Sequence, residues 1–248
     1  MHLILDIGNT RTKLGVFEQG NLVGHEIWDD WDLHDLQNFM ERYPLIQRVA
    51  VSTVTYIWEE VEDFLRSHFF YVRLTHETPI PIDNAYATPA TLGRDRLAAV
   101  IGAFDLYPTD NCLVIDAGTC IKYDILLAKD EGYSQYIGGN IAPGINMRLQ
   151  AMHHFTAKLP KIEQADIQKN YGTSTETALR NGGQLGAAME MQAFIDTFRH
   201  EFGQMTVILT GGDANYFAKK LKTQIFVHPN LVLIGLNKIL TYNVKHSK

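Results

Sequence analysis

Two segments of the sequence share one pattern, an apolar strand that ends in Asp-x-Gly. Residues 3–10 read LILDIGNT and residues 113–120 read LVIDAGTC, so that Asp6 aligns with Asp116. A single match of this kind is a common turn signal and has little weight. Here each copy opens a similar series of strands and helices. Internal duplication limits the possible architectures more than any other feature of the chain.

The hydrophobic periodicity predicts the same plan after both segments. In the first part we expect strands at 2–8, 12–18, 21–28, 48–54 and 69–74 and helices at 33–43 and 58–68. In the second part we expect strands at 112–118, 120–128, 133–142, 205–212 and 223–227, with helices from about Pro143, over 175–202, after 212 and at the end. The sequence therefore predicts an α/β fold of two related domains with mixed sheets, residues 1–110 and 111–248.

Composition excludes two classes of function. The 248 residues carry a formal net charge of -6, and Lys and Arg are scattered, so a nucleic-acid partner is not expected. No stretch approaches the roughly 18 uninterrupted apolar residues of a membrane span, and no basic region precedes the first apolar run. The two cysteines, Cys112 and Cys120, form no CxxC pair and are interpreted as small buried residues. We expect a cytoplasmic protein that does not bind membranes.

The two Asp-x-Gly turns have the composition of a nucleotide-phosphate site. Such a site needs carboxylates for Mg²⁺, donors for phosphate oxygens, and glycine where the backbone must come close. In the first turn Asp6 can bind the metal or its water shell, and Gly8 removes side-chain bulk. Asp116 and Thr119 offer the same chemistry in the second turn. We expect the phosphates in a cleft between the two domains.

Other nucleotide motifs are missing from the sequence. It contains no G-x-x-x-x-G-K-[ST] and no G-x-G-x-x-G after a strand. The segment Thr210–Asp213, TGGD, ends a predicted strand and starts a helix. Its glycines, Gly211 and Gly212, are compatible with close approach to an adenosine and equally with an ordinary strand-to-helix turn.

With DIGNTRTK, DAGT and TGG in this order, the chain resembles the superfamily of acetate and sugar kinases, heat-shock chaperones and actin. That resemblance implies two duplicated ribonuclease H-like domains with ATP bound in the cleft between them. It does not identify the second substrate.

The segment 84–104, NAYATPATLGRDRLAAVIGAF, bears on that substrate. Gly93 permits a tight turn, after which Asp95 and Arg96 lie in the first turn of a predicted helix. They are compatible with a plain helix start, in which Asp95 faces the positive end of the helix dipole and Arg96 is solvated. They are equally compatible with a kinase site, where Asp95 accepts the hydroxyl proton and Arg96 binds an acidic substrate.

Five segments together resemble the type III pantothenate kinases: NAYATPATLGRDR, DAGTCIKYDI, GGNIAPGINMRLQAM, TAKLP and GTSTETA. The resemblance covers nearly the whole chain. It implies ATP-dependent phosphorylation of the terminal hydroxyl of pantothenate to 4'-phosphopantothenate, the first step of coenzyme A synthesis. It also implies a homodimer whose substrate site draws on both subunits.

The resemblance assigns roles to particular residues. Asp95 would be the catalytic proton acceptor, and Asp116 would hold a monovalent cation, K⁺ or NH4⁺, in addition to the Mg²⁺ that accompanies ATP. The residues expected to bind ATP are Asp6, Ile7, Gly8, Asn9, Thr10, Arg11, Thr12, Lys13 and Thr119. The residues expected to bind pantothenate are Tyr86, Gly93, Arg94, Asp95, Arg96 and Thr175.

Two rival functions use the same ATP motifs. A sugar kinase of the superfamily would have sugar-directed carboxamides in place of GRDR, and a nucleotide-driven switch would bind ATP without turnover. Two structural alternatives also remain open. The helix LAAVIGAF is compatible with a dimer interface or with a core, and GGNIAPG with phosphate-facing amides or with an ordinary turn.

Overall fold

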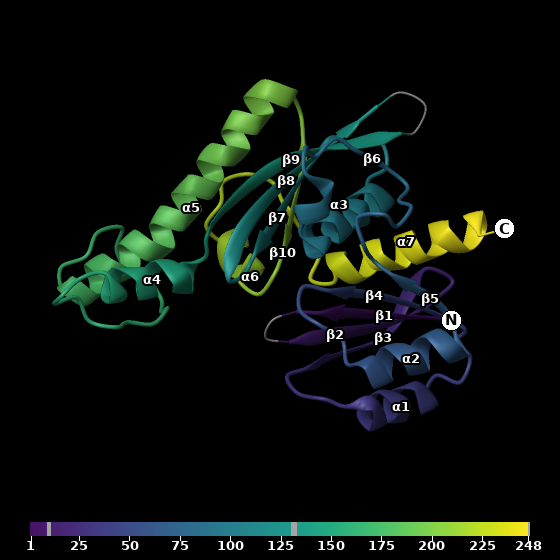
Figure 1. The fold of residues 1–248 in the computed structure, drawn as a ribbon. Coiled ribbons are helices and arrows are strands. Elements are labelled where there is room, and N and C mark those ends of the chain that lie inside the picture. Colours follow the sequence, from purple (N-terminus) through teal and green to yellow (C-terminus); the bar gives the residue numbers. More distant parts are fainter. Residues whose placement is uncertain (9–10, 130–132, 248) are drawn as a thin grey trace. The chain divides into compact units, whose positions relative to one another are not determined.

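The computed structural model describes residues 1–8, 11–129 and 133–247 and divides into two compact units (Figure 1). Unit 1 comprises Met1–Thr109, Ala128–Ile137 and Asn230–Lys248. Unit 2 comprises Asp110–Leu127 and Gly138–Pro229. The sequence predicted domains at residues 1–110 and 111–248. Unit 1 also includes Ala128–Ile137 and Asn230–Lys248, which come later in the chain.

Unit 1 contains a five-stranded mixed sheet in the order β3-β2-β1-β4-β5. β1 pairs antiparallel with β2 and parallel with β4, and β4 pairs parallel with β5. The strands are β1 (His2–Ile7), β2 (Thr12–Glu18), β3 (Asn21–Trp28), β4 (Arg48–Thr53) and β5 (Phe70–Arg73). The carboxyl ends of β1 and β4 therefore lie side by side, at the end where the first Asp-x-Gly turn follows β1.

Helices α1 (Leu33–Glu41) and α2 (Glu59–His68) cover one face of this sheet (Figure 1). Alternate residues of β1, β2 and β4 point toward these helices, as expected for strands buried on that face. Asp32 and Asp35 form a reciprocal capping box that fixes the start of α1.

The opposite face is covered by α3 (Arg94–Leu106) and α7 (Leu231–His246). A Cβ at Gly15 of β2 would lie 3.1 Å from Leu233 of α7, which shows how closely that helix lies on the sheet. Residues Leu97–Ala103 of α3 are buried, and a Cβ at Gly102 would collide with the backbone of Leu231. The helix LAAVIGAF is therefore a core helix of unit 1.

A short strand that the sequence did not predict, β6 (Asp83–Asn84), positions the segment before α3. It pairs with Gln135 and Tyr136, in the first part of β9 (Ser134–Pro143). A single 3₁₀ turn, η1 (Pro89–Thr91), then leads into α3.

Unit 2 repeats the sheet of unit 1. Its strands are β7 (Cys112–Ala117), β8 (Cys120–Ala128), β10 (Thr206–Thr210), β11 (Phe226–Val227) and the later residues of β9. Their order is β9-β8-β7-β10-β11, with β7 antiparallel to β8 and parallel to β10. Taken in chain order, both sheets read 3-2-1-4-5. The predicted mixed α/β fold with a duplicated plan is confirmed.

The helices of unit 2 are α4 (Ile145–His154), α5 (Thr175–Phe202) and α6 (Ala214–Ala218). Ser174 caps α5 through a reciprocal box with Thr177, so the helix begins where the sequence predicts. Among the described residues, no helix is both long and apolar enough to cross a membrane.

Candidate active site

The first Asp-x-Gly turn joins β1 to β2. Gly8 donates its N–H to the carbonyl of Arg11 at 3.0 Å, and a Cβ at Gly8 would lie only 2.9 Å from that oxygen. Asp6 pairs with Lys13 across the ladder, and directly opposed residues of an antiparallel pair point to the same face. The carboxylate and the ammonium predicted to bind a nucleotide thus lie on one face of the sheet.

Other residues of this motif have structural contacts. Ile7 is part of the core, and the hydroxyl of the buried Thr12 accepts the indole N–H of Trp31 at 2.9 Å. Arg11 is exposed and forms an ion pair with Asp29. Two further predicted ATP ligands, Asn9 and Thr10, lie outside the described residues. The ATP contacts of all these residues stay predictions.

The second turn joins β7 to β8 in the same way. Gly118 donates its N–H to the carbonyl of Cys120 at 3.0 Å, which closes the turn. Asp116 lies directly opposite Lys122 in the ladder, and Nζ of Lys122 is 2.8 Å from Oδ2 of Asp116. This cross-strand pair repeats the Asp6–Lys13 arrangement of the first turn. Lys13 is among the residues that the sequence predicts to bind ATP, whereas Lys122 is not.

The glycine pair after β10 lies against this second turn. Gly211 has φ +91°, and a Cβ there would be 2.5 Å from Oδ1 of Asp116 and would collide with the carbonyl of Ala117. Asp213 donates its backbone N–H to that same carbonyl at 2.9 Å. The predicted adenosine segment and the second phosphate motif are therefore neighbours within unit 2.

The start of α4 also contacts the second turn. Gly144, the N-cap of α4, donates its N–H to the carbonyl of Thr119 at 3.1 Å. A Cβ at Gly144 would collide with the carbonyl oxygen of Gly118. This contact favours the interpretation of GGNIAPG as part of the phosphate region, because the first amides of a helix are unpaired donors.

The segment predicted to bind pantothenate forms one cluster in unit 1. Oδ1 of Asp95 accepts the backbone N–H of Arg96 at 2.9 Å in the first turn of α3. A Cβ at Gly93 would lie 2.7 Å from that oxygen, so glycine is needed for the carboxylate to fold back over the helix start. The sequence predicted both the helix start and the turn.

Arg96 is buried, with a relative exposure of 5%, and is not the solvated residue of a plain helix start. Its guanidinium lies 5.5 Å from the ring centroid of Tyr86, and Nη1 donates to the Tyr86 hydroxyl at 3.5 Å. Tyr86 stacks on Tyr136 with centroids 5.9 Å apart and planes 7° apart. A buried charged group needs polar partners, and the Tyr86 hydroxyl is one partner of Arg96.

Tyr136 and Arg94 show what the sequence could not predict. Tyr136 is fully buried in β9 and reaches Tyr86 only because β6 pairs with β9. The guanidinium of Arg94 donates to the carbonyls of Pro89, Ala90 and Leu92, so it stabilises the turn before α3. Thr175 is exposed on unit 2 as the first residue of α5, and its contact with substrate stays a prediction.

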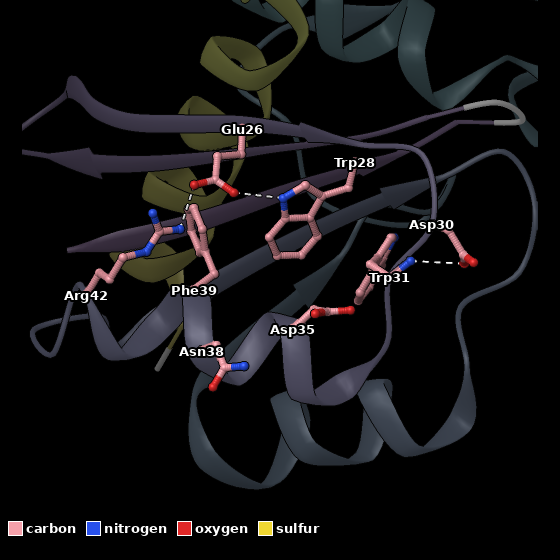
Figure 2. A pocket seen from close by; sticks show the side chains of 8 residues that line it. All are labelled: Glu26, Trp28, Asp30, Trp31, Asp35, Asn38, Phe39 and Arg42. Carbon is pink, nitrogen blue, oxygen red and sulfur yellow. Dashed lines mark hydrogen bonds and ion pairs between the residues drawn. The ribbon is translucent and has the colours of Figure 1, made fainter.

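A surface hollow of about 470 Å³ over β3 and α1 lies outside these motifs (Figure 2). It is lined by Glu26, Trp28, Asp30, Trp31, Asp35, Asn38, Phe39 and Arg42. Glu26 accepts hydrogen bonds from Trp28 at 2.7 Å and from Arg42 at 2.6 Å. Although burial opposes it, these bonds hold the pKa of Glu26 below its ordinary value. The carboxylate of Glu26 and the guanidinium of Arg42 are thus bound to each other in this hollow.

The described residues contain no group of three or more His, Cys, Asp or Glu side chains placed to hold a metal ion. Mg²⁺ does not require such a group, since it commonly binds through one or two carboxylates together with substrate phosphates and water. Asp6, at the end of β1, fits that mode of binding.

Known proteins are similar in sequence to this chain over nearly its whole length. The family model for type III pantothenate kinase matches residues 2–197. A type III pantothenate kinase of Phocaeicola vulgatus is 44% identical over 245 residues, which cover 99% of this chain and 100% of the relative. One from Christiangramia forsetii is 38% identical and covers 98% and 99%.

Among solved structures, a ROK hexokinase of Thermus thermophilus matches with a TM-score of 0.55 over 98% of this chain and 99% of that chain. At 13% identity the likeness concerns the fold alone, and it supports the duplicated ribonuclease H-like architecture. The family assignment rests on the similarity in sequence, which extends over nearly the whole length of the curated relatives. This chain belongs to the type III pantothenate kinase family.

Proposed function

We propose that this chain transfers the γ-phosphoryl group of ATP to the terminal hydroxyl of pantothenate and forms 4'-phosphopantothenate, the first step of coenzyme A synthesis. The observation that carries the proposal is the 44% identity to a type III pantothenate kinase over the full length of both chains. The buried Arg96 beside Asp95 gives that family assignment a chemical basis in this chain.

Each of the two Asp-x-Gly turns is a proposed phosphate-binding motif. Phosphoryl transfer depends mostly on positioning and on neutralising charge. Lys13 and Thr119 supply donors for phosphate oxygens, and Asp6 would hold Mg²⁺ or its water shell. Bound Mg²⁺ neutralises part of the charge on the phosphates. Gly211 and Gly212 give the adenosine close access to the backbone, as the small residues of such turns do.

The cluster of Tyr86, Asp95 and Arg96 at the start of α3 is the proposed pantothenate site. Asp95 accepts the proton of the attacking hydroxyl, a role for which a fixed carboxylate within hydrogen-bond reach is required. Its hydrogen bond from the Arg96 N–H supplies that fixed orientation. The Arg96 guanidinium binds the substrate carboxylate, and Tyr86, stacked on Tyr136, holds the guanidinium in place.

The monovalent cation implied at Asp116 does not fit the donor set in this chain. Oδ2 of Asp116 is bound by Nζ of Lys122, and Oδ1 lies where a side chain on Gly211 would be. K⁺ or NH4⁺ at Asp116 would have to displace an ammonium group that is already there. The proposal therefore routes no step through such an ion.

A homodimer is the proposed assembly. Several large apolar side chains of unit 2 are exposed, on α4, α5 and the segment between them: Met147, Phe155, Tyr171 and Met189. These side chains are the proposed contacts of the interface, since large exposed apolar patches mark interaction sites. Light scattering after size-exclusion chromatography tests the assembly, and a monomer at micromolar concentration would contradict it.

An ADP-release assay with pantothenate, pantothenol and a panel of sugars tests the function. We expect turnover with pantothenate and identification of the product as a phosphate monoester by ³¹P NMR. Turnover with a sugar alone would support the sugar-kinase alternative. ATP binding without turnover of any of these compounds would favour a nucleotide-driven switch.

A further inference from the structure

Lys122 and Asp116 form a close ion pair inside the second phosphate motif. Nζ lies 2.8 Å from Oδ2, and each side chain has a relative exposure of only 21%. Charge pairs at this degree of burial are screened less by solvent and salt than fully exposed pairs. The attraction between the two charges therefore persists at moderate salt concentration.

The β7–β8 ladder fixes this pair. Lys122 lies directly opposite Asp116, and the turn between them is closed by the Gly118–Cys120 hydrogen bond. A slip of one residue would move the Lys122 side chain to the other face of the sheet. Gly144 also donates its N–H to the carbonyl of Thr119 in this turn. The ammonium is thus placed by the fold and not only by mutual attraction.

The same arrangement occurs in unit 1, where Asp6 faces Lys13 across β1–β2. Each Asp-x-Gly turn of this chain is thus followed by a lysine opposite its aspartate. The register thus places a lysine opposite the aspartate in both hairpins, and in the second hairpin the ammonium is in contact with the carboxylate.

A free monovalent cation at Asp116 would compete with that ammonium. An ion bound to Oδ2 would have to displace Nζ or lie a few ångströms from it, where two like charges repel. On the Oδ1 side the backbone of Gly211 lies close, since a Cβ there would be 2.5 Å from that oxygen. An ammonium group carries the same unit charge as K⁺ and donates three hydrogen bonds.

We propose that Lys122 is the built-in cation of the second phosphate motif: it positions Asp116 and supplies the positive charge there, so that nucleotide binding needs neither K⁺ nor NH4⁺. The inference rests on the proposed function in that it takes ATP as the ligand of this motif. Lys122 is accordingly a positioning residue, acting through Asp116 and the phosphate region.

The wild-type protein provides the first test. ADP binding with Mg²⁺ is measured by calorimetry in K⁺, NH4⁺, Na⁺ and tetramethylammonium chloride at one ionic strength, since screening alone changes the affinity of charged ligands. We expect dissociation constants that agree within about twofold, well inside one tenfold step of 1.4 kcal/mol. An affinity at least about tenfold higher in K⁺ and NH4⁺ than in tetramethylammonium would overturn the proposal.

Three variants provide the second test. Lys122→Ala removes the charge and leaves room for an ion, Lys122→Arg keeps the charge, and Lys129→Met removes an exposed lysine just after β8. In tetramethylammonium we expect Lys122→Ala to lose about ten- to a hundredfold in ADP affinity, the range for a hydrogen bond to a charged group, and to regain part of it in K⁺. Lys122→Arg and Lys129→Met should remain independent of the ion.

Unchanged ADP affinity in Lys122→Ala, or an equal loss in all four salts, would contradict the role of Lys122 as a cation. If Lys122→Ala does not fold, the wild-type comparison and Lys122→Arg still decide. The ADP measurement is also separate from turnover: a protein that fails to phosphorylate pantothenate overturns the proposed function, whereas ion-specific ADP binding overturns this inference alone.

Discussion

The carboxylate of Asp95 accepts the backbone N–H of the next residue, Arg96, at a distance of 2.9 Å. Adjacent residues on a helix point in different directions, yet this bond ties the orientation of the carboxylate to the first turn of α3. The proposed base and the proposed substrate-binding guanidinium thus belong to one helix start. Because their proposed roles differ, replacement of Asp95 should affect kcat and replacement of Arg96 should affect pantothenate binding.

Asp95→Asn retains an oxygen that can accept the Arg96 N–H but removes the base. We expect kcat to fall by about 10²–10⁴, the usual contribution of general base catalysis, while ADP affinity is unchanged. Steady-state kinetics and calorimetry measure the two effects. Near-normal turnover at neutral pH would exclude Asp95 from the catalytic role.

Arg96→Lys keeps the charge but loses the two-point contact that a guanidinium makes with a carboxylate. We expect weaker pantothenate binding, by up to about 1.5–3 kcal/mol, the range for hydrogen bonds to charged groups. Pantothenol lacks the carboxylate, so its binding should change little. If both compounds lose the same affinity, the role of Arg96 is confined to packing against Tyr86.

Gly211→Ala introduces a Cβ where φ is +91° and where Oδ1 of Asp116 would be 2.5 Å away. The backbone alone costs about 1–2 kcal/mol for a residue other than glycine, and displacement of Asp116 adds to that cost. We expect a lower free energy of unfolding and weaker ADP binding. In Gly212→Ala the added Cβ meets nothing within 4 Å, so its stability is the control. Equal stability of the two variants would contradict the predicted strain.

The pH dependence of stability should report on His2. Burial lowers the pKa of His2 below its ordinary value of 6.5, and the hydrogen bond with Asn237 opposes this shift only in part. Because the folded state then binds fewer protons than the unfolded state, the stability from this group is present above about pH 6.5 and is lost as the pH falls.

Urea denaturation between pH 5 and 7 measures this effect, with His2→Gln for comparison. Nδ1 of the neutral ring donates to Asn237 at 2.7 Å, and Nε2 accepts from Arg48 at 3.3 Å, so protonation would place an N–H against a guanidinium. We expect a smaller dependence of unfolding free energy on pH in His2→Gln. The burial that lowers the pKa of His228 acts in the same direction in both proteins. An unchanged dependence would exclude His2 as its source.

Sequence periodicity predicted the strands of both sheets, including β11, which the structure confines to Phe226–Val227, but not the order in which they pair. It missed β6 and η1, which have two and three residues and no period to detect. The burial of Arg96 could not be predicted either, since it depends on Tyr86 being held by a strand pair that joins distant segments.

Some residues of the candidate site could be predicted from the sequence and others could not, for a physical reason. Asp116, Thr119 and Gly211 follow strands with readable ends, and the parallel pairing of β7 with β10 brings them together. Lys122 was missed because its importance depends on the antiparallel register, which residue type does not reveal. The signal available was spacing: a lysine follows Asp6 by seven positions and Asp116 by six.

The placement of α7 has a consequence for synthesis on the ribosome. Residues of β1 emerge early, whereas Leu231–His246, which close the opposite face of the same sheet, emerge only after all of unit 2. Domains normally fold as units while the chain grows, but the part of this face that α7 covers stays exposed until the helix emerges. A nascent chain whose residues 1–229 have left the ribosome without α7 should therefore bind chaperones and be cleaved readily by protease within unit 1, while unit 2 is already resistant.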